Sequence, residues 1–197
     1  MTDRPILFSG PMVRAILEGR KTQTRRFLAP ACDANNMPFV SVHHGLWKRS
    51  QNGIKVFMDR GDRLWARETF GYNHYGYEAR SAPKMRPVDF ESHSIAYRAT
   101  ERDSEILNDI LWRPSIHMPR WSSRLTLVVE SAWCEQLQDI TESDAHAEGF
   151  KNVGEFADYW NSLTKTHQWH ENPWVLVIEF KPVFENIDKI NTTRGAG

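Results

Sequence analysis

The chain has little cysteine, no long apolar run and no net charge. Its 197 residues include two cysteines, Cys32 and Cys134, which form no Cys-x-x-Cys pair. The sequence therefore indicates neither a disulfide framework nor a structural zinc site. No window approaches the ~20 uninterrupted apolar residues of a membrane-spanning helix, and the N-terminal segment does not resemble a cleavable signal. These absences predict a soluble, cytoplasmic protein that does not interact with a membrane.

The charges cancel overall but are unevenly distributed. Lys plus Arg and Asp plus Glu each number 25, so the whole chain exerts no net attraction on nucleic acid. The basic residues of one N-terminal group are Arg14, Arg20, Lys21, Arg25 and Arg26, and the acidic residues of a later group are Glu135, Asp139, Glu142, Asp144 and Glu148. This segregation either places opposite charges across one cleft or reflects unrelated solvated patches.

The first part of the chain predicts one helix and then strands. Residues 9–11, Ser-Gly-Pro, can cap and start a helix, and Gly19 is placed to end it. Residues 21–28, KTQTRRFL, then alternate β-branched and longer polar side chains, as strands do. The pair Asn52-Gly53 predicts a hairpin turn within residues 38–58.

Later segments predict further strands and two helices. Thr141 is a predicted N-cap of a helix that reaches Gly149, and residues 113–121, RPSIHMPRW, contain two prolines and predict an ordered loop. Strands are predicted within residues 60–70, 95–99, 123–133 and 172–183, and a helix over 153–163. Many strands with few helices predict an α+β fold, a small mixed β-barrel, closed or nearly closed, that short helices decorate.

The length predicts one domain, because domains average about 150 residues. We expect that domain over residues 1–185, followed by a flexible C-terminal tail over 186–197.

Three short sequence motifs follow one another along the chain. GRKT ends the first helix, GDRLWARE follows, and ITESDAHAEG precedes a final VLVIEF strand. Together they resemble the ASCH domains, relatives of the PUA fold that is associated with RNA. The resemblance covers most of the chain, implies a PUA-like barrel, and leaves insertions at about 28–58 and 71–120.

The first stretch departs from the usual ASCH signature, which has Gly, Lys, Glu and Arg at relative positions one, three, six and eight. Gly19, Lys21 and Arg26 fit that signature, whereas Thr24 occupies the glutamate position. The chain resembles in this respect the small bacterial ASCH amidohydrolases that deacetylate N(4)-acetylcytidine, which read GRKT-x-T-x-R. Their third catalytic residue is a glutamate seven positions after the threonine of a TE-x-x-A helix, which is Glu148 here.

The resemblance thus implies Lys21, Thr24 and Glu148 as catalytic residues. Deacylation needs a nucleophile, a proton acceptor and stabilisation of an oxyanion. The Thr24 hydroxyl is the candidate nucleophile and Lys21 the base, since neighbouring arginines and desolvation favour a neutral lysine. Glu148 would orient these groups or relay a proton, and Arg26 or backbone N–H groups at Gly19 would bind the oxyanion.

Ordinary structural roles are the alternative. In a regular strand, Lys21 and Thr24 point to opposite faces because they are three residues apart, so they converge only through a late strand start or a bulge. Otherwise they belong to a solvated, charged strand end.

Substrate contacts are expected from arginines and aromatic rings, including Arg20 and Arg26. The chain has eight tryptophans, and Trp65 or Trp121 could stack on a base, with core packing as the alternative. The prolines of the 113–121 loop would hold Arg120 and Trp121 rigidly at the cleft.

The leading interpretation is a metal-independent amidohydrolase that acts on an N(4)-acylated cytidine or cytosine-type substrate and needs no cofactor. His167 and His170 lack a third ligand at metal-binding spacing. The chain is much longer than the enzymes named above and also resembles phage and prophage ASCH proteins with RPSIHMPRW loops. The alternatives are therefore a non-catalytic RNA- or nucleotide-binding module, or an ASCH-type ribonuclease, with single-stranded RNA as partner. The sequence leaves the oligomeric state and the role of residues 71–120 open.

Overall fold

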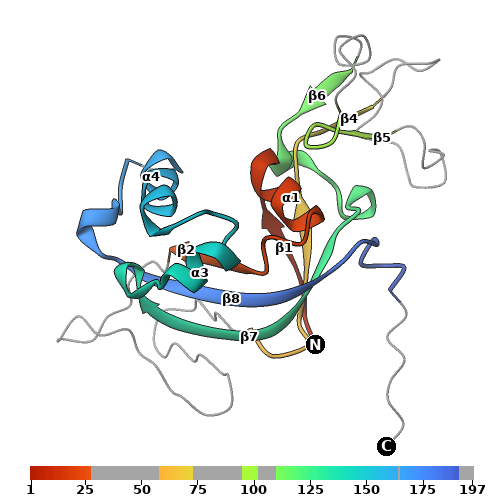
Figure 1. The fold of residues 1–197 in the computed structure, drawn as a ribbon. Coiled ribbons are helices and arrows are strands. Elements are labelled where there is room, and N and C mark those ends of the chain that lie inside the picture. Colours follow the sequence, from red (N-terminus) through yellow and green to blue (C-terminus); the bar gives the residue numbers. More distant parts are fainter. Residues whose placement is uncertain (28–57, 73–94, 102–109, 164, 191–197) are drawn as a thin grey trace, which may run out of the picture. The chain divides into compact units, whose positions relative to one another are not determined.

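The computed structural model describes residues 1–27, 58–72, 95–101, 110–163 and 165–190 (Figure 1). The predicted hairpin turn at Asn52-Gly53 lies outside the described residues, as do residues 28–57 of the first expected insertion and residues 73–94 and 102–109 of the second. In the described part of the chain, no helix combines the length and apolar character that crossing a membrane requires.

Strands and a few helices make up the described chain, which confirms a mixed α+β fold. The strands are β1 (Asp3–Leu7), β2 (Gln23–Phe27), β3 (Arg63–Arg67), β4 (Phe70–Tyr72), β5 (Ile95–Tyr97), β6 (Leu111–Arg113), β7 (Thr126–Gln136) and β8 (Trp174–Val183). The helices are α1 (Gly10–Leu17), α3 (Glu142–Ala147) and α4 (Val153–Leu163). Hydrogen-bonded neighbours follow the orders β1-β3-β7-β8-β2 and β5-β4-β6, and among the described residues these two sheets form no closed barrel.

The chain divides into two compact units, each built from separate segments. Unit 1 comprises Met1–Thr2, Glu18–Arg63 and Val128–Pro182, and unit 2 comprises Asp3–Leu17, Leu64–Leu127 and Val183–Gly197. Strand β7 begins in unit 2 and continues in unit 1. The single domain expected over residues 1–185 stays a prediction.

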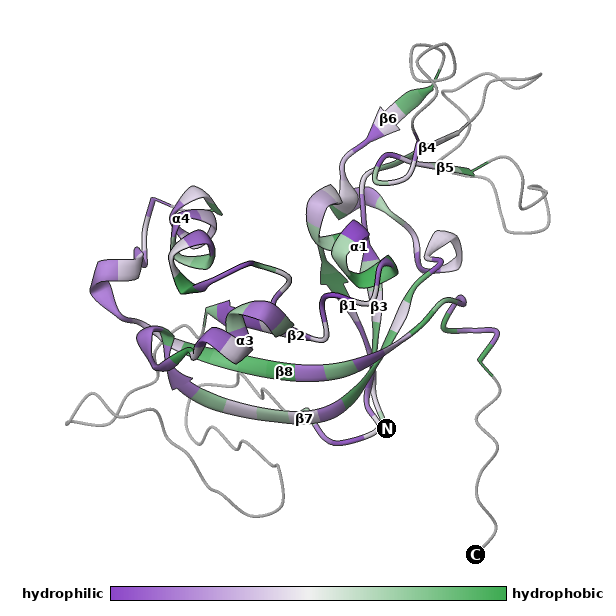
Figure 2. Cartoon of the chain, viewed as in Figure 1, coloured by the Kyte–Doolittle hydropathy of each residue, from purple (hydrophilic) through white to green (hydrophobic). Residues whose placement is uncertain are grey.

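In unit 1, β8 is the central apolar strand. Its buried residues include Val175 and Val177 on one face and Leu176 and Ile178 on the other, which explains why residues 175–178 are all hydrophobic, the green part of β8 (Figure 2). Val175 and Val177 belong to a cluster that also contains Leu137, Ile140, Ala145, Phe156 and Trp160. Burial of these side chains holds helices α3 and α4 against the sheet.

Strand β2 pairs antiparallel with β8 at the end of the strand order. Thr24 lies opposite Ile178, and Arg25 lies opposite Val177. Before the strand, Gly19 has φ +73°, a left-handed conformation that glycine adopts without steric cost. The predicted helix before Gly19 is confirmed as α1, which ends at Leu17, and the predicted strand begins at Gln23 rather than at residue 21.

Helix α3 begins with a capping box. The Asp144 backbone N–H donates to the Thr141 hydroxyl over 3.1 Å, and the Thr141 backbone N–H donates to the Asp144 carboxylate over 3.0 Å. The helix ends with Glu148 as its C-cap, followed by Gly149 at φ +94°. The helix predicted from Thr141 is thereby confirmed, and its end fixes the position of Glu148.

Unit 2 contains the three-stranded sheet, around buried Phe70 and Met118. Phe70 of β4 lies opposite Tyr97 of β5 and Arg113 of β6. The strand predicted within 95–99 is confirmed as β5, whereas β1, β4 and β6 were not predicted as separate strands. The predicted loop 113–121 contains 3₁₀ turns at Ser115–His117 and Arg120–Ser122.

The capping box predicts a measurable loss of stability when Thr141 loses its hydroxyl. Thr141→Ala should lower the free energy of unfolding by about 1 kcal/mol, because the Asp144 N–H loses its acceptor. Urea denaturation followed by circular dichroism measures this change. Thr141→Ser, which keeps the oxygen, is the matched control, and equal losses in the two variants would contradict a capping role.

Candidate functional site

Lys21 is buried between Gly19 and β2. Its side chain is 1% exposed, and Nζ donates to Glu148 Oε2 over 2.5 Å and to the Glu148 backbone carbonyl over 2.9 Å. The Thr22 backbone N–H donates to the Ala147 carbonyl over 2.8 Å, so this segment is attached to the C-terminal end of α3. The structure therefore brings together Lys21 and Glu148, two of the three residues that the sequence predicts to be catalytic.

Burial perturbs the protonation of Lys21. Desolvation lowers the pKa of Lys21, the carboxylate of Glu148 offsets part of this effect, and the charges of Arg26 and Arg25 lower the pKa further. A lysine with a lowered pKa loses its proton more readily near neutral pH than an exposed one. The direction of this shift favours the neutral form that a general base requires.

Arg25 contacts the second oxygen of the same glutamate. Its Nη1 lies 3.4 Å from Glu148 Oε1 and donates to Gln23 Oε1 over 2.5 Å. Its Nε and Nη2 donate to Glu135 Oε1 over 2.9 and 2.6 Å. One Glu148 oxygen thus faces Lys21 and the other faces Arg25, which restricts rotation of the carboxylate.

Asp144 and Trp133 complete this arrangement. Gln23 Nε2 donates to Asp144 Oδ1 over 3.2 Å, and Trp133 Nε1 donates to Glu135 Oε2 over 2.8 Å. Burial raises the pKa of Asp144, but hydrogen bonds from Thr141 and Gln23 and the charge of Arg25 outweigh it, so the pKa is lowered overall. We call the connected residues Lys21, Gln23, Arg25, Glu135, Asp144 and Glu148 the buried charge network.

The network explains the segregation of charges along the sequence. Lys21 and Arg25 come from the basic N-terminal group, whereas Glu135, Asp144 and Glu148 come from the later acidic group. Their ion pairs join the two groups inside unit 1. For these residues the opposite charges meet in ion pairs and do not form unrelated surface patches, whereas a cleft between the two groups stays a prediction.

Thr24 is buried, at 3% exposure, within the regular part of β2. Gln23 and Arg25 hydrogen-bond to each other and share one face of the strand, so the side chain of Thr24 leaves from the opposite face. Within the described residues, no hydrogen bond joins the Thr24 hydroxyl to Lys21 or Glu148. The nucleophilic role of Thr24 stays a prediction.

Arg20 and Arg26 flank the network differently. Arg20 is about half exposed, pairs with Glu18 over 2.5 Å, and donates to the Gly149 carbonyl over 3.2 Å. Arg26 is partly buried, and burial lowers its pKa while the charge of Glu148 raises it. Arg20 therefore lies beside the turn that follows Glu148, and Arg26 lies within electrostatic range of that carboxylate.

The two candidate tryptophans belong to unit 2. Trp65 is 8% exposed, and the Arg67 guanidinium lies 5.4 Å from its ring centre. Trp121 packs against the cluster of Phe70 and Met118. Core packing, the alternative to base stacking, accounts for Trp65 and for part of the Trp121 surface.

Arg120 also belongs to unit 2, where two carboxylates engage it. Its Nη2 lies 2.6 Å from Asp3 Oδ2 and 2.7 Å from Asp188 Oδ1, and these partners raise the pKa of its guanidinium. These ion pairs hold the loop 113–121 to other parts of unit 2. A role for Arg120 or Trp121 beside Lys21 stays a prediction.

Other reactive side chains give weaker candidates. Burial, followed by the charge of Glu135, raises the pKa of Cys134 to about 12, so the thiol stays protonated at neutral pH. The ring of His167 stacks on Phe27, with 3.6 Å between ring centres. In the part of the chain that the structure describes, no three His, Cys, Asp or Glu side chains are grouped to hold a metal ion.

Sequence reasoning missed the roles of Gln23, Arg25, Glu135 and Asp144. The spacing of Lys21, Gln23 and Arg25 could have indicated part of the network. They are two residues apart, and strand residues with that spacing share a face. For Glu135 and Asp144, the sequence showed only that acidic residues gather in one later segment, which does not indicate their partners.

The comparisons with known proteins leave the function to be inferred from residues and geometry. No protein-family model, no curated protein and no solved structure matches the chain. The resemblance to ASCH domains therefore rests on the motifs of the sequence.

The Lys21–Glu148 pair should behave as a buried ion pair in a double-mutant cycle. Lys21→Met and Glu148→Gln should each lower the free energy of unfolding by about 3–5 kcal/mol, because each removes one member of a buried, desolvated ion pair. The double variant should lose clearly less than the sum of the two, as urea denaturation would show.

The exposed pair of Arg20 and Glu18 supplies the matched control. Arg20→Ala should cost below about 1 kcal/mol, because water solvates both charges after the pair is broken. Additive losses for Lys21 and Glu148 would contradict the coupling seen in the structure.

Proposed function

We propose that the chain is a metal-independent amidohydrolase with a PUA-like, ASCH-type fold. Its substrate would be an N(4)-acylated cytidine or a related cytosine derivative. One observation carries this proposal: a buried lysine with a lowered pKa lies 2.5 Å from a buried glutamate, at the two positions that the sequence motifs indicate. A neutral lysine held by a carboxylate can move a proton between a nucleophile and a leaving amine.

The proposed reaction has two stages. The Thr24 hydroxyl oxygen attacks the acyl carbonyl carbon, and its proton passes to neutral Lys21 Nζ. Collapse of the tetrahedral intermediate breaks the bond between the acyl carbon and the exocyclic nitrogen, which takes the proton from Lys21. Water then attacks the threonyl ester and gives a proton to Lys21; the ester C–O bond breaks as Lys21 returns that proton to the Thr24 oxygen, which releases the carboxylic acid and restores the threonine. Thr24 must come within ~2.6–3.2 Å of Lys21 Nζ for the first stage.

Glu148 and Arg25 would prepare Lys21 for this role. Glu148 Oε2 accepts a hydrogen bond from Lys21 Nζ and is the nearest group to receive the proton that makes the lysine neutral. Arg25 faces the other oxygen of Glu148 and keeps it directed at Lys21. Arg26, which is electrostatically coupled to Lys21 and Glu148, would balance negative charge on the substrate oxygen.

The second candidate is a non-catalytic RNA- or nucleotide-binding module, with a ribonuclease as a variant. Its support is the position of Thr24, whose hydroxyl is not hydrogen-bonded to Lys21 or Glu148 in the described structure. The buried charge network weighs against it, because carboxylates of the same chain already pair with Lys21 and Arg25. Cations that are paired internally contribute little to phosphate binding.

Turnover of N(4)-acetylcytidine separates these candidates. Thr24→Ala and Lys21→Arg should each abolish deacetylation, because alanine lacks the hydroxyl and arginine stays protonated near neutral pH. Thr24→Ser should keep part of the activity, and a chelator should leave the wild type unaffected. Mass analysis of the products measures turnover, and circular dichroism confirms that each variant is folded. Full turnover in Thr24→Ala would exclude Thr24 as nucleophile.

The lowered pKa of Lys21 predicts the pH dependence. Below that pKa the lysine is protonated and cannot accept a proton, so kcat/KM should rise with pH through the pKa and then level off. The pH profile of kcat/KM tests this, and NMR titration of the Lys21 side chain provides a readout that does not depend on turnover. A titration at the ordinary lysine value of about 10.4 would contradict the proposed base.

A further inference from the structure

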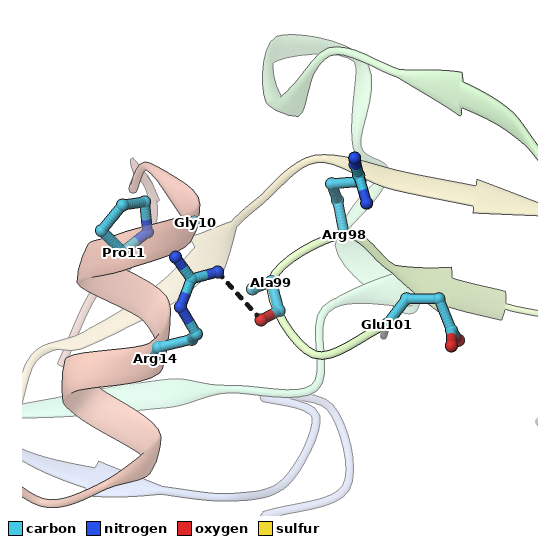
Figure 3. Close-up of a pocket in the computed structure, with 6 residues that line it drawn as sticks. All are labelled: Gly10, Pro11, Arg14, Arg98, Ala99 and Glu101. Atoms are coloured by element: carbon cyan, nitrogen blue, oxygen red, sulfur yellow. Dashed lines mark hydrogen bonds between the residues drawn. The ribbon is translucent and has the colours of Figure 1, made fainter. Parts of the chain in front are cut away.

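Unit 2 contains an open hollow of about 450 Å³ that the proposed function does not use. It is lined by Gly10, Pro11, Arg14, Arg98, Ala99 and Glu101 (Figure 3). Small-molecule sites usually measure about 300–1,000 Å³, so the hollow has room for a small metabolite. Three of its six lining residues carry charged side chains, and two of these are arginines from different segments.

Arg14 reaches the hollow from α1. Its Nη1 donates to the Ala99 carbonyl over 3.1 Å, which fixes the guanidinium beside the turn that follows β5 (Figure 3). Among the described residues this is the one hydrogen bond of the Arg14 side chain, and a guanidinium has five N–H donors. Most donors of Arg14 thus remain available to a ligand in the hollow.

Arg98 reaches the hollow from the turn itself. Its side chain is exposed, and the guanidinium carbon lies 5.3 Å from the centre of the Trp112 ring. Stacking on an aromatic face orients a guanidinium but leaves the N–H groups at its edge unoccupied. Within the described part of the chain, no hydrogen bond to the Arg98 guanidinium is found.

The turn that carries Arg98 is held in place. The backbone N–H groups of Thr100 and Glu101 both donate to the Tyr97 carbonyl over 3.0 Å. Arg124 donates to the Thr100 hydroxyl over 3.0 Å and forms two further hydrogen bonds with the buried Glu68. The site is therefore largely formed before a ligand arrives, which reduces the entropy lost on binding.

We propose that this hollow binds the phosphate group of a small phosphate monoester. Guanidinium groups match phosphate oxygens in geometry and charge, and two arginines suit a group that carries nearly two negative charges. Glu101 lines the same hollow and opposes a bare anion. A monoester can place its uncharged organic part on the Glu101 side of the hollow, so the site selects it over inorganic phosphate, whose other oxygens would face that negative charge. The proposal rests on unit 2 residues and stands whether or not the chain is an amidohydrolase.

Isothermal titration of the full chain at low ionic strength tests the proposal, with ribose 5-phosphate, inorganic phosphate and ribose as probes. We expect ribose 5-phosphate to bind more tightly than inorganic phosphate, and ribose not to bind. Arg98→Gln and Arg14→Gln should each weaken ribose 5-phosphate binding by at least about tenfold, through loss of charge-assisted hydrogen bonds. Glu101→Gln should strengthen the binding of inorganic phosphate, because it removes a repulsive charge.

Arg60, an exposed arginine of unit 1, supplies the matched control. Arg60→Gln should leave the affinity unchanged, and an equal loss in this variant would show unspecific charge attraction and overturn the proposal. Equal affinities for the two phosphates, or no binding of ribose 5-phosphate, would also overturn it. Because Arg98 is exposed, Arg98→Gln should fold normally, which thermal unfolding verifies, and it decides the outcome if Arg14→Gln is unstable.

Discussion

The buried pair of Lys21 and Glu148 is the interaction on which the arrangement of unit 1 depends. Removing both charges from water costs several kcal/mol for each ion, and only close, well-directed contacts offset this cost. Three conditions supply such contacts: the chain turns at Gly19, α3 ends at Glu148, and Arg25 faces the second oxygen of the carboxylate. A shift of β2 or α3 would leave charges buried without partners, so the pair fixes these two elements relative to each other.

The same desolvation also determines how readily Lys21 gives up its proton. A solvated lysine keeps its proton at neutral pH, whereas burial disfavours the charged form of Lys21 and the nearby arginines add to this effect. Glu148 acts in the opposite direction, because its carboxylate stabilises the ammonium. The protonation of Lys21 therefore reflects a balance between burial and one carboxylate, and any group that changes the position of Glu148 also changes the basicity of the lysine.

Local patterns in the sequence predicted much of the fold but not the smallest elements. Thr141 and the apolar run of β8 predicted their elements because capping and hydrophobicity act over a few residues. Strands β4 and β6 have three residues each, and they exist because Phe70 pairs with both neighbouring strands. A side chain at Gly71 would come within 2.2 Å of an Ile110 carbon, a constraint that arises only after the strands pair.

For the candidate site, local sequence patterns were enough to predict the residue types and their local geometry. They indicated the turn at Gly19, the end of α3 and the motif positions of Lys21 and Glu148. The hydrogen bond between these two residues, 127 positions apart, became visible only in the folded chain, as did the position of Thr24 on the face of β2 opposite Gln23 and Arg25. Short-range preferences set a helix end or a turn, whereas contacts between distant segments depend on how the whole core packs.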